Sequence, residues 1–526
     1  MEQLEQISAY LNANTNLLFS TVIFMVVFTI SLRLYNVLHL KPNRIRSRLV
    51  EQGMQGPKPA ILLGNIPQLK KMQANLQKPP IKPGHFSNDW PRSVFPFFNK
   101  WTEEYGKNFT FALGTMQVLF LSGPEVVKQV YQCSSIDLGK PVYQQKEHGA
   151  LLGTGILTSN GPLWAYQRKM MQPELLIEKV KNMYDLIVQS ATVLVNKWDT
   201  QIDKTKGVGN FRIDDDLRNF SADVITRACF GSNYSKSQEI FLRIGDLRKV
   251  MVKKSFLLGL PGLRHLPIKS NRDKWRLEKE IRRLIMNVVE EREQKAQVNH
   301  KDLLQVIIEG AKGGNFSKER MDRFVADNCK NVYIAGDETT GITICWTLLL
   351  LAAKPEYQTR VREEVLQGFQ GQSVPDFETL RKMKWLTMVI QESMRLYPTV
   401  SIMSKEALED LEFGNIKVPK GTIIWLPLVM LNRDKELWGP DAEEFNPERF
   451  ANGVAGACKI PQLYQPFGSG PRICIGMNLA MMEIRLAIAL LLSKFSFSVP
   501  PDYCHSPAYK LILQPEHGLN LNVKRI

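Results

Sequence analysis

A single cysteine in a glycine-rich turn, Cys474, is the residue whose type and surroundings most directly indicate chemistry. It lies in the run FGSGPRICIG at residues 467–476. Glycine lets the backbone approach a flat ligand closely. Backbone N–H groups and the start of a following helix, from about Gly476, would stabilise a negative charge on the sulfur. One cysteine without partners for a metal tetrahedron suits an axial ligand to haem iron. The alternative is a buried structural cysteine in a glycine turn.

A second group, AGDETT at residues 335–340, combines acids with alcohols inside a segment of helical periodicity, 317–353. Gly336 costs a helix interior about 1 kcal/mol relative to alanine, so we expect it to permit the close approach of a ligand. A threonine hydroxyl can bond back to the backbone and open a notch. An acid followed by an alcohol offers a proton route for splitting bound O2. Two solvated acids beside a threonine pair are the alternative, and the cysteine run favours the catalytic interpretation.

Two further spacings place charged side chains on one helix face. Glu392 and Arg395 stand at i and i+3 in a segment that ends at Pro398, and Trp164 and Arg168 stand at i and i+4. Both spacings bring side chains together on a helix. Alone, each pattern is weak, because such ion pairs are common on exposed faces and the second pattern is most often a core tryptophan beside a surface arginine.

Apolar residues at three-and-four spacing predict the helices that carry these groups. Short β-branched runs bounded by glycine or proline, such as residues 418–424, predict strands with turns. No long linker divides the chain after residue 100, and no repeat of about 20 to 50 residues is visible. The expected fold class is mainly α with small β-sheets, in one large catalytic unit. The predicted helical segments are 164–172, 177–201, 273–297, 317–353, 376–396 and 476–495.

The amino terminus predicts a membrane anchor. From Tyr10 to Leu32 there is no charge, and extending past Arg33 to Leu38 gives about the 20 residues that span a bilayer. Acidic residues precede this stretch and basic residues follow it, which places the rest of the chain in the cytosol. A cleaved secretory peptide would have the reverse order of charge.

Proline and glycine follow the anchor, in GPKP at residues 56–59, and predict a stiff, non-helical hinge. The division we expect is a membrane anchor at 1–40, a basic and Pro/Gly-rich hinge at 41–70 and a haem-binding domain at 71–526.

The composition narrows the function classes. The chain has 526 residues and a net charge of +16, but its basic residues are scattered. We find no zinc-finger spacing or aromatic RNA-binding motif, so no nucleic-acid partner is expected. The cluster beside the membrane and an acidic protein partner explain the surplus of positive charge. Seven cysteines without a C-x-x-C pair indicate a reducing compartment. Gly153-Thr154-Gly155 lacks the third glycine of a nucleotide-binding loop, so electrons would come from a separate protein.

The run at 467–476 matches the haem-binding pattern F-x-x-G-x-R-x-C-x-G at every fixed position. From about residue 55 to 526 the chain resembles the plant microsomal cytochromes P-450. The resemblance implies the cytochrome P-450 fold behind one N-terminal transmembrane helix, and haem b with Cys474 as the metal ligand. The cofactor-binding residues that it implies are Cys474, Arg472, Trp164, Arg168, Phe467, Gly468, Gly476 and Lys405, the last standing where relatives commonly have arginine.

Other family patterns assign further roles by position. The pattern A-G-x-[DE]-T makes Glu338 the catalytic acid and Thr339 the alcohol that guides protons. The pattern E-x-x-R joins Glu392 and Arg395 to Arg449, from the later run PERF, in a structural triad that holds the thiolate loop. The substrate-pocket residues carried over by position are Asn331, Ala335, Thr399, Val400 and His517.

The resemblance implies a monooxygenase that inserts one oxygen atom from O2 into an apolar substrate. Electrons would come from NADPH through cytochrome P-450 reductase. The chain would be a monomer, anchored by a single pass in the endoplasmic reticulum membrane, with membrane lipid as a further partner. The stretch GILTSNG at 155–161 looks most like the gibberellin-oxidising branch of a clan that also hydroxylates cytokinins, brassinosteroids and triterpenoids. A terpenoid substrate, hydroxylated or epoxidised, is therefore expected.

Two other function classes stay open. A haem-thiolate isomerase or dehydratase would not use O2; such relatives tend to lack the acid–alcohol pair, which this chain keeps, and product formation without NADPH would favour it. A non-catalytic, membrane-bound sterol or haem carrier would bind carbon monoxide after reduction but would fail a turnover assay.

Overall fold

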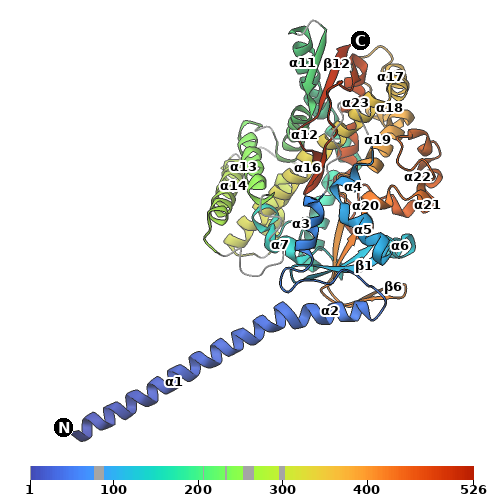
Figure 1. Ribbon diagram of the computed structural model, residues 1–526. Coiled ribbons are helices and arrows are strands. Elements are labelled where there is room, and N and C mark those ends of the chain that lie inside the picture. The colour runs from blue at the N-terminus through green and yellow to red at the C-terminus, as the bar shows by residue number, and fades with distance from the viewer. Residues whose placement is uncertain are drawn as a thin grey trace.

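The chain folds around one long helix, with other helices on several sides of it (Figure 1). The computed structural model describes residues 2–75, 88–204, 207–231, 234–252, 266–294, 302–314 and 316–526. Helices predominate and the sheets are small, so the fold class expected from the sequence is confirmed.

The α-helices are α1 Glu2–Tyr35, α2 Lys41–Val50, α3 Ile66–Ala74, α4 Trp90–Val94, α5 Pro96–Tyr105, α6 Pro124–Gln132, α7 Val142–Glu147, α8 Gly149–Leu152, α9 Gly161–Met171, α10 Ile177–Asn182, α11 Tyr184–Lys204, α12 Ile213–Phe230, α13 Tyr234–Val252, α14 Lys269–Gln294, α15 Leu303–Gly313, α16 Lys318–Ala353, α17 Pro355–Phe369, α18 Phe377–Lys382, α19 Lys384–Leu396, α20 Leu428–Leu431, α21 Lys435–Trp438, α22 Gly453–Ala457 and α23 Met477–Lys494. The strands are β1 Asn108–Leu113, β2 Met116–Leu121, β3 Leu138–Gly139, β4 Val208–Arg212, β5 Met403–Ala407, β6 Leu411–Phe413, β7 Ile416–Val418, β8 Ile423–Leu426, β9 Phe495–Ser498, β10 Pro507–Lys510, β11 Ile512–Pro515 and β12 Asn520–Arg525.

Two of the helices expected from periodicity are divided. Segment 177–201 forms α10 and α11, and segment 376–396 forms α18 and α19. The second break is stabilised from α17, because the Glu364 carboxylate accepts hydrogen bonds from the N–H groups of residues 384–386 at 2.6 to 3.0 Å. A carboxylate there satisfies the free donors of a helix start, and the local pattern cannot reveal it. Segment 273–297 corresponds to α14, with residues 295–297 outside the described residues.

α16 is the central helix, and most of its residues from Phe324 to Ala352 are buried. It packs most extensively against α12 and also contacts α23, the helix that follows Cys474. The approach to α12 is close: a Cβ atom added to Gly341 would lie 2.8 Å from the carbonyl oxygen of Leu217. The helix with the acid–alcohol group and the helix after the cysteine therefore share one core.

The largest sheet in the described residues has the strand order β1-β2-β8-β5-β3. β1 and β2 form an antiparallel hairpin, β8 is parallel to β2, and β5 is antiparallel to β8 with Lys405 opposite Ile424. The strand and turn expected at 418–424 are the end of β7, a turn and the start of β8. This sheet holds Lys405 at a fixed place in the domain.

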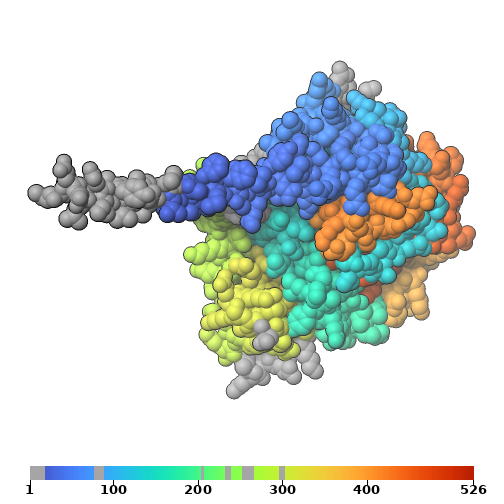
Figure 2. All heavy atoms as spheres, turned by 90° about the horizontal axis from the view of Figure 1, so that it is seen from below, coloured from blue at the N-terminus to red at the C-terminus, as the bar shows by residue number. Residues whose placement is uncertain are grey.

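The amino-terminal helix α1 forms a rod that leaves the domain (Figures 1 and 2). α1 continues through a π-helical turn, Asn36–Leu40, into α2. The helical stretch Leu18–Val50 contains a window of mean hydropathy 1.9, none of it buried in the protein, and it is long and apolar enough to cross a membrane. An apolar helix with no protein around it is suited to lipid, so this part of the chain fits the membrane anchor expected from the sequence.

Residues 41–70, expected to be a hinge, are packed on the domain. Pro42, Ile45 and Leu49 of α2 are buried, because their spacing places them on one helix face. The stretch after α2 is non-helical, as expected, but it is fixed to β1: the Thr110 N–H donates to the Gln55 carbonyl at 2.9 Å. The stretch therefore behaves as part of the domain and not as a free connector.

Candidate functional site

The cysteine run forms a tight loop in front of α23. Residues Gly470–Arg472 make a 3-10 turn, and the Cys474 N–H donates to the Phe467 carbonyl at 2.9 Å, which closes the loop. Gly468 and Gly470 have φ angles of +75° and +63°, a region that other residues rarely adopt. Gly476 is the residue before α23 begins. The pattern of glycines is thus explained by the backbone of this loop.

The Cys474 side chain is exposed, yet it is enclosed by protein. Its residue is open to solvent-sized space, although burial raises the pKa of its thiol while the Gly476 N–H and Arg168 act to lower it. A side chain with both properties can face a ligand that is held inside the protein. By contrast, Cys229, Cys329 and Cys345 are buried. Cys504 is exposed as well, but Cys474 is the cysteine whose sulfur lies near the Gly476 N–H and Arg168, which suits an axial ligand that faces a cofactor.

Beside this loop, two arginines flank one tryptophan. The guanidinium carbons of Arg472 and Arg168 lie 4.2 and 5.9 Å from the ring centre of Trp164, which is 7% exposed. Arg168 donates to the Ile473 carbonyl at 2.8 Å, and Arg472 donates to Asn160 Oδ1 at 2.8 Å. Burial lowers the pKa of both arginines, that of Arg472 to about 10, with repulsion from Arg168 as a second cause.

Two lysines complete this group of cations. The pKa of Lys405 and that of Lys140 are each lowered to about 8, mainly by burial; repulsion from Arg472 contributes to both, and Lys405 contributes to the lowering at Lys140. Lys405 was expected here from the resemblance, whereas Lys140 was not singled out. Within the described ranges, no ion pair joins any of the four cations to a carboxylate. We call Lys140, Arg168, Lys405 and Arg472 the cation cluster.

The residues present fit haem. Desolvated cations that repel one another gain from an anionic partner, and the two propionates of haem would supply it at the cation cluster. A thiol at the wall of an internal cavity, with an N–H directed at sulfur, supplies the axial ligand. Cys474, Phe467, Gly468 and Gly476 therefore belong to the same site as the cation cluster.

The opposite wall of this site is expected on α16. A short stretch of this helix is partly exposed. Residues 334–337 and Thr339 are partly open, although the residues before and after them on α16 are buried. Ala335 and Thr339 share a face at i and i+4, and the Thr339 hydroxyl donates to the Ala335 carbonyl at 2.7 Å. The back-bonding expected from the sequence is therefore present. The helix is continuous here, so the openness comes from its surroundings and not from a break.

The backbone at Gly336 lies close to another helix, whereas the expected approach of a ligand there stays a prediction. A Cβ atom added at Gly336 would lie 2.4 Å from Ile225 Cγ1 of α12, and its carbonyl accepts a hydrogen bond from the Ser221 hydroxyl at 2.6 Å. The glycine is needed because α12 crosses α16 closely here. Periodicity could not distinguish a close helix from a close ligand.

The acids of the same stretch face cations. Glu338 is 4% exposed and forms an ion pair with Arg248 of α13. Burial raises the pKa of the neighbouring Asp337 to about 6, against the opposing effects of Arg248 and Arg218. Arg248 comes from a helix about 90 residues earlier in the sequence, and no local signal pairs it with α16. The acid of the expected proton route is thus held in place by a charge on another helix.

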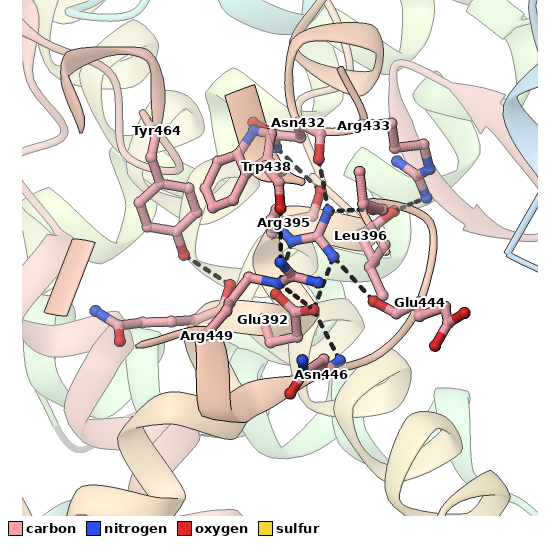
Figure 3. A network of polar contacts seen from close by, with 12 residues as sticks. Glu392, Arg395, Leu396, Asn432, Arg433, Trp438, Glu444, Asn446, Arg449 and Tyr464 are labelled. Atoms are coloured by element: carbon pink, nitrogen blue, oxygen red, sulfur yellow. Dashed lines mark hydrogen bonds and ion pairs between the residues drawn. The ribbon is translucent and has the colours of Figure 1, made fainter. Parts of the chain in front are cut away.

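The triad Glu392, Arg395 and Arg449 forms a buried network (Figure 3). The Glu392 and Arg395 side chains are 0% exposed and pair at 2.6 Å, and Arg449 pairs with Glu392 at 3.1 Å and with Asp441 at 2.8 Å. Arg395 also donates to the carbonyls of Asn432, Ala442 and Glu444. The guanidinium of Arg395 thus binds three backbone carbonyls between residues 432 and 444, a segment that follows α19 in the chain.

The network is connected to the cysteine loop through the helix that bears it. The Tyr464 hydroxyl, which lies ten residues before Cys474, donates to the Gln391 carbonyl of α19 at 2.7 Å (Figure 3). The Tyr464 ring also packs against Trp438, which Arg395 overlies at 5.1 Å. These contacts are what a triad that positions the thiolate loop would require.

The residues expected to line the substrate pocket are placed differently from one another. Ala335 is partly open and Thr399 is half-buried, with its hydroxyl 3.2 Å from that of Thr343. Val400 is 42% exposed. Asn331 is fully buried, and its amide is bonded to the backbone of residues 152 and 157. His517 lies after β11 with 71% of its side chain exposed, 3.9 Å from Glu516. The Asn331 amide is therefore occupied by backbone groups, and the geometry places His517 at the surface, in contrast to the expectation that both line the pocket.

Comparison with known proteins agrees with this site. The family model described as "Cytochrome P450" matches residues 54–523. "Cytochrome P450 714C2" of Oryza sativa subsp. japonica is 47% identical over 492 residues, covering 93% of this chain and 94% of that protein. "Cytochrome P450 714A2" of Arabidopsis thaliana is 40% identical over 512 residues, covering 95% and 97%. "Cytochrome P450 714B3" of Zea mays is 40% identical over 502 residues, covering 94% and 93%. The chain belongs to the cytochrome P450 family, as a plant member similar to its 714 proteins, and is a haem-dependent monooxygenase that takes electrons from a reductase.

Proposed function

We propose that this P450 inserts one oxygen atom from O2 into an apolar plant terpenoid, by hydroxylation or epoxidation. Diterpenoids of the gibberellin type and triterpenoids are the substrate classes to test first. The observation that carries the proposal is the enclosed opening at Cys474, together with the partly open Ile334 and Ala335 in an otherwise buried helix. Apolar side chains beside a few polar groups favour a largely hydrocarbon ligand. The run at 155–161, which resembles the gibberellin-oxidising branch, supports the choice of terpenoids.

In this proposal, bound haem with a thiolate ligand supplies the activation of O2 and the transfer of oxygen to a C–H or C=C bond. Cys474 holds the group as an anion, and the Gly476 N–H stabilises the charge on sulfur. Arg168, Arg472 and Lys405 bind the propionates, and Lys140 adds a further positive charge. The Trp164 ring contacts both arginine side chains and helps to hold them in place.

Protons reach the distal side through α16 in this proposal. The Thr339 hydroxyl, donating now to the Ala335 carbonyl, can also accept a proton from solvent and present it on the open face. Glu338 is the acidic side chain beside Thr339 in this route, and its ion pair with Arg248 holds it in place. The isomerase alternative needs no such acid–alcohol pair, which is why oxygen insertion is favoured.

The proposed setting is the endoplasmic reticulum membrane, with the catalytic domain in the cytosol and NADPH–cytochrome P450 reductase as the electron donor. The anchor rod and the basic residues after it support this orientation. The proposed assembly is a monomer in lipid, with a hydrophobic small molecule as its substrate.

The test is turnover in microsomes that contain the full chain and the reductase. Gibberellin-type diterpenoids and triterpenoid acids are supplied with NADPH, and product masses are read. We expect a gain of about 16 Da, lost without NADPH and lost in Cys474→Ser. Product formed without NADPH would favour an isomerase. An intact carbonyl adduct with no conversion of either class would make the terpenoid assignment wrong.

A further inference from the structure

Residues 150–158, the end of α8 and the irregular stretch after it, lie against the amino-terminal half of α16 and are bound by four polar side chains of that helix. Asp327 and Lys330 are 2% exposed, and Asn328 and Asn331 are 0% exposed. We call these four residues the α16 clamp. Buried polar groups on a central helix are costly unless they have partners, so their partners indicate their purpose.

The first half of the clamp binds N–H groups of the segment. The N–H and the hydroxyl of Thr154 donate to Asp327 Oδ2 at 2.8 and 3.2 Å. The Ile156 N–H donates to Asn328 Oδ1 at 3.1 Å. Loops seldom bury their backbone, because the polar groups would be unsatisfied. Side chains of α16 supply the acceptors here.

The second half binds carbonyl groups as well. Asn331 accepts from the Leu157 N–H at 2.8 Å and donates to the Leu152 carbonyl at 2.6 Å. Lys330 donates to the Ala150 carbonyl at 3.0 Å and forms an ion pair with Asp327 at 2.9 Å. The buried ion pair thus spans both halves, and removing one partner would leave the other charge buried alone.

Two glycines of the segment allow this contact. Gly153 has a φ angle of +55°, and a Cβ atom added there would lie 2.0 Å from Asp327 Cγ. A Cβ atom added to Gly155 would lie 2.7 Å from Asn331 Cγ. The segment is therefore shaped to lie directly on the clamp, which explains the glycine pair that a nucleotide-binding loop does not.

The segment connects the two walls of the site. Asn331 stands one helical turn before Ala335, on the face of α16 that leads to the open stretch. At the other end, the Ser159 carbonyl and Asn160 Oδ1 accept hydrogen bonds from Arg472 at 3.1 and 2.8 Å. In the chain, Ile156 comes before the residues that Arg472 binds, and its side chain is half-buried against the core.

We propose that the α16 clamp makes residues 150–158 a fixed wall of the substrate cavity, and that Asn331 is a positioning residue which limits the size of the ligand admitted. One net hydrogen bond changes the equilibrium constant between the closed and the open state of a segment by about tenfold. The combined contacts keep the segment closed, so the cavity has a defined shape before substrate arrives. This proposal shares one premise with the proposed function, namely that the cavity accepts an apolar molecule beside haem.

The test uses the full-length haem protein and the variant Asn331→Leu, which keeps the branched shape and the number of heavy atoms of the side chain and loses both hydrogen bonds. Thr347→Val is the matched control: Thr347 is buried on the same helix, and its hydroxyl is bonded to the Thr343 carbonyl at 2.7 Å and to Ser393 at 2.9 Å. The probes are imidazole and 1-(triphenylmethyl)imidazole, whose binding to iron shifts the haem absorption. Deuterium exchange of a peptide covering residues 150–158 is read in parallel.

We expect Asn331→Leu to speed exchange of the 150–158 amides by about tenfold and to strengthen binding of the bulky imidazole by about tenfold relative to imidazole itself. Thr347→Val should change neither. Equal shifts for both probes, or faster exchange without a change in their ratio, would overturn the proposal.

A second variant, Asn331→Asp, keeps the shape and the acceptor but loses the donor to the Leu152 carbonyl, and the same two readouts apply to it. Loss of haem from both variants would also overturn the proposal, because the clamp would then be a requirement for folding. Neither probe is a terpenoid, so a negative turnover assay and a negative clamp result are distinguishable.

Discussion

The substitution Asp337→Asn tests the electrostatics of the distal helix. Burial raises the pKa of Asp337 from 3.8 to about 6, a difference of about 2 units, or up to about 3 kcal/mol. Because the side chain is only partly buried, solvent lessens this value. The native state holds the proton more tightly than the unfolded state does. This contribution to stability is therefore complete below about pH 4 and is lost as the pH rises through about 6.

Asparagine keeps the shape of the neutral acid and does not titrate. We expect Asp337→Asn to equal the unaltered protein in stability near pH 4 and to exceed it by up to about 3 kcal/mol at pH 7.5. For 526 residues, an unfolding entropy of about 2.1 cal/mol/K per residue converts this to a rise of about 3 °C in Tm.

The assay is thermal unfolding of the detergent-solubilised haem protein at a fixed scan rate, from about pH 4.5 to 7.5. Glu319→Gln is the control, because it removes a carboxylate from the same helix where the side chain is 82% exposed. A gain that is the same at both ends of the pH range, or no gain at pH 7.5, would refute the reasoning that desolvation governs this acid.

Other substitutions test the remaining parts of the site. Cys474→Ser should abolish the absorption of the reduced carbonyl adduct at about 450 nm, read by difference spectroscopy. Thr339→Ala should lower the product formed per NADPH consumed by at least about tenfold and raise the peroxide released, whereas Thr339→Ser should keep the product yield. An unchanged product yield in Thr339→Ala would contradict the proton route. Arg395→Met should destabilise the fold by about 3 to 5 kcal/mol and release haem, because it leaves Glu392 buried with one partner fewer. Lys405→Met should speed haem transfer to apomyoglobin and Lys405→Arg should slow it, since arginine offers a bidentate fork to a propionate.

Much of the site could be predicted because its parts are close in the sequence. The cysteine, its glycines and Arg472 fall within ten residues, and the acid–alcohol group falls within six. Their geometry depends on local backbone angles and on helix spacing, which local sequence patterns predict. The membrane anchor and the mainly helical fold follow from periodicity and apolar length, which are also local properties.

The tertiary structure decided which distant groups meet. Lys140 joins Lys405 and Arg472, Arg248 pairs with Glu338, and Asn331 binds a segment about 175 residues earlier in the chain. None of these pairs leaves a periodic signal, since each depends on how separate helices and strands pack.

The sequence by itself therefore indicated the chemistry of this protein: a cysteine in a glycine loop that is suited to haem iron, an acid–alcohol pair on a helix, and an apolar helix in front that is long enough to anchor the chain in a membrane. Only the folded chain decided the environment in which this chemistry takes place, including the desolvated cations, the charge that pairs with Glu338 and the hydrogen bonds between α16 and residues 150–158. The reason is physical. Desolvation and long-range pairing are properties of a packed interior, and they exist only once segments far apart in the sequence are in contact.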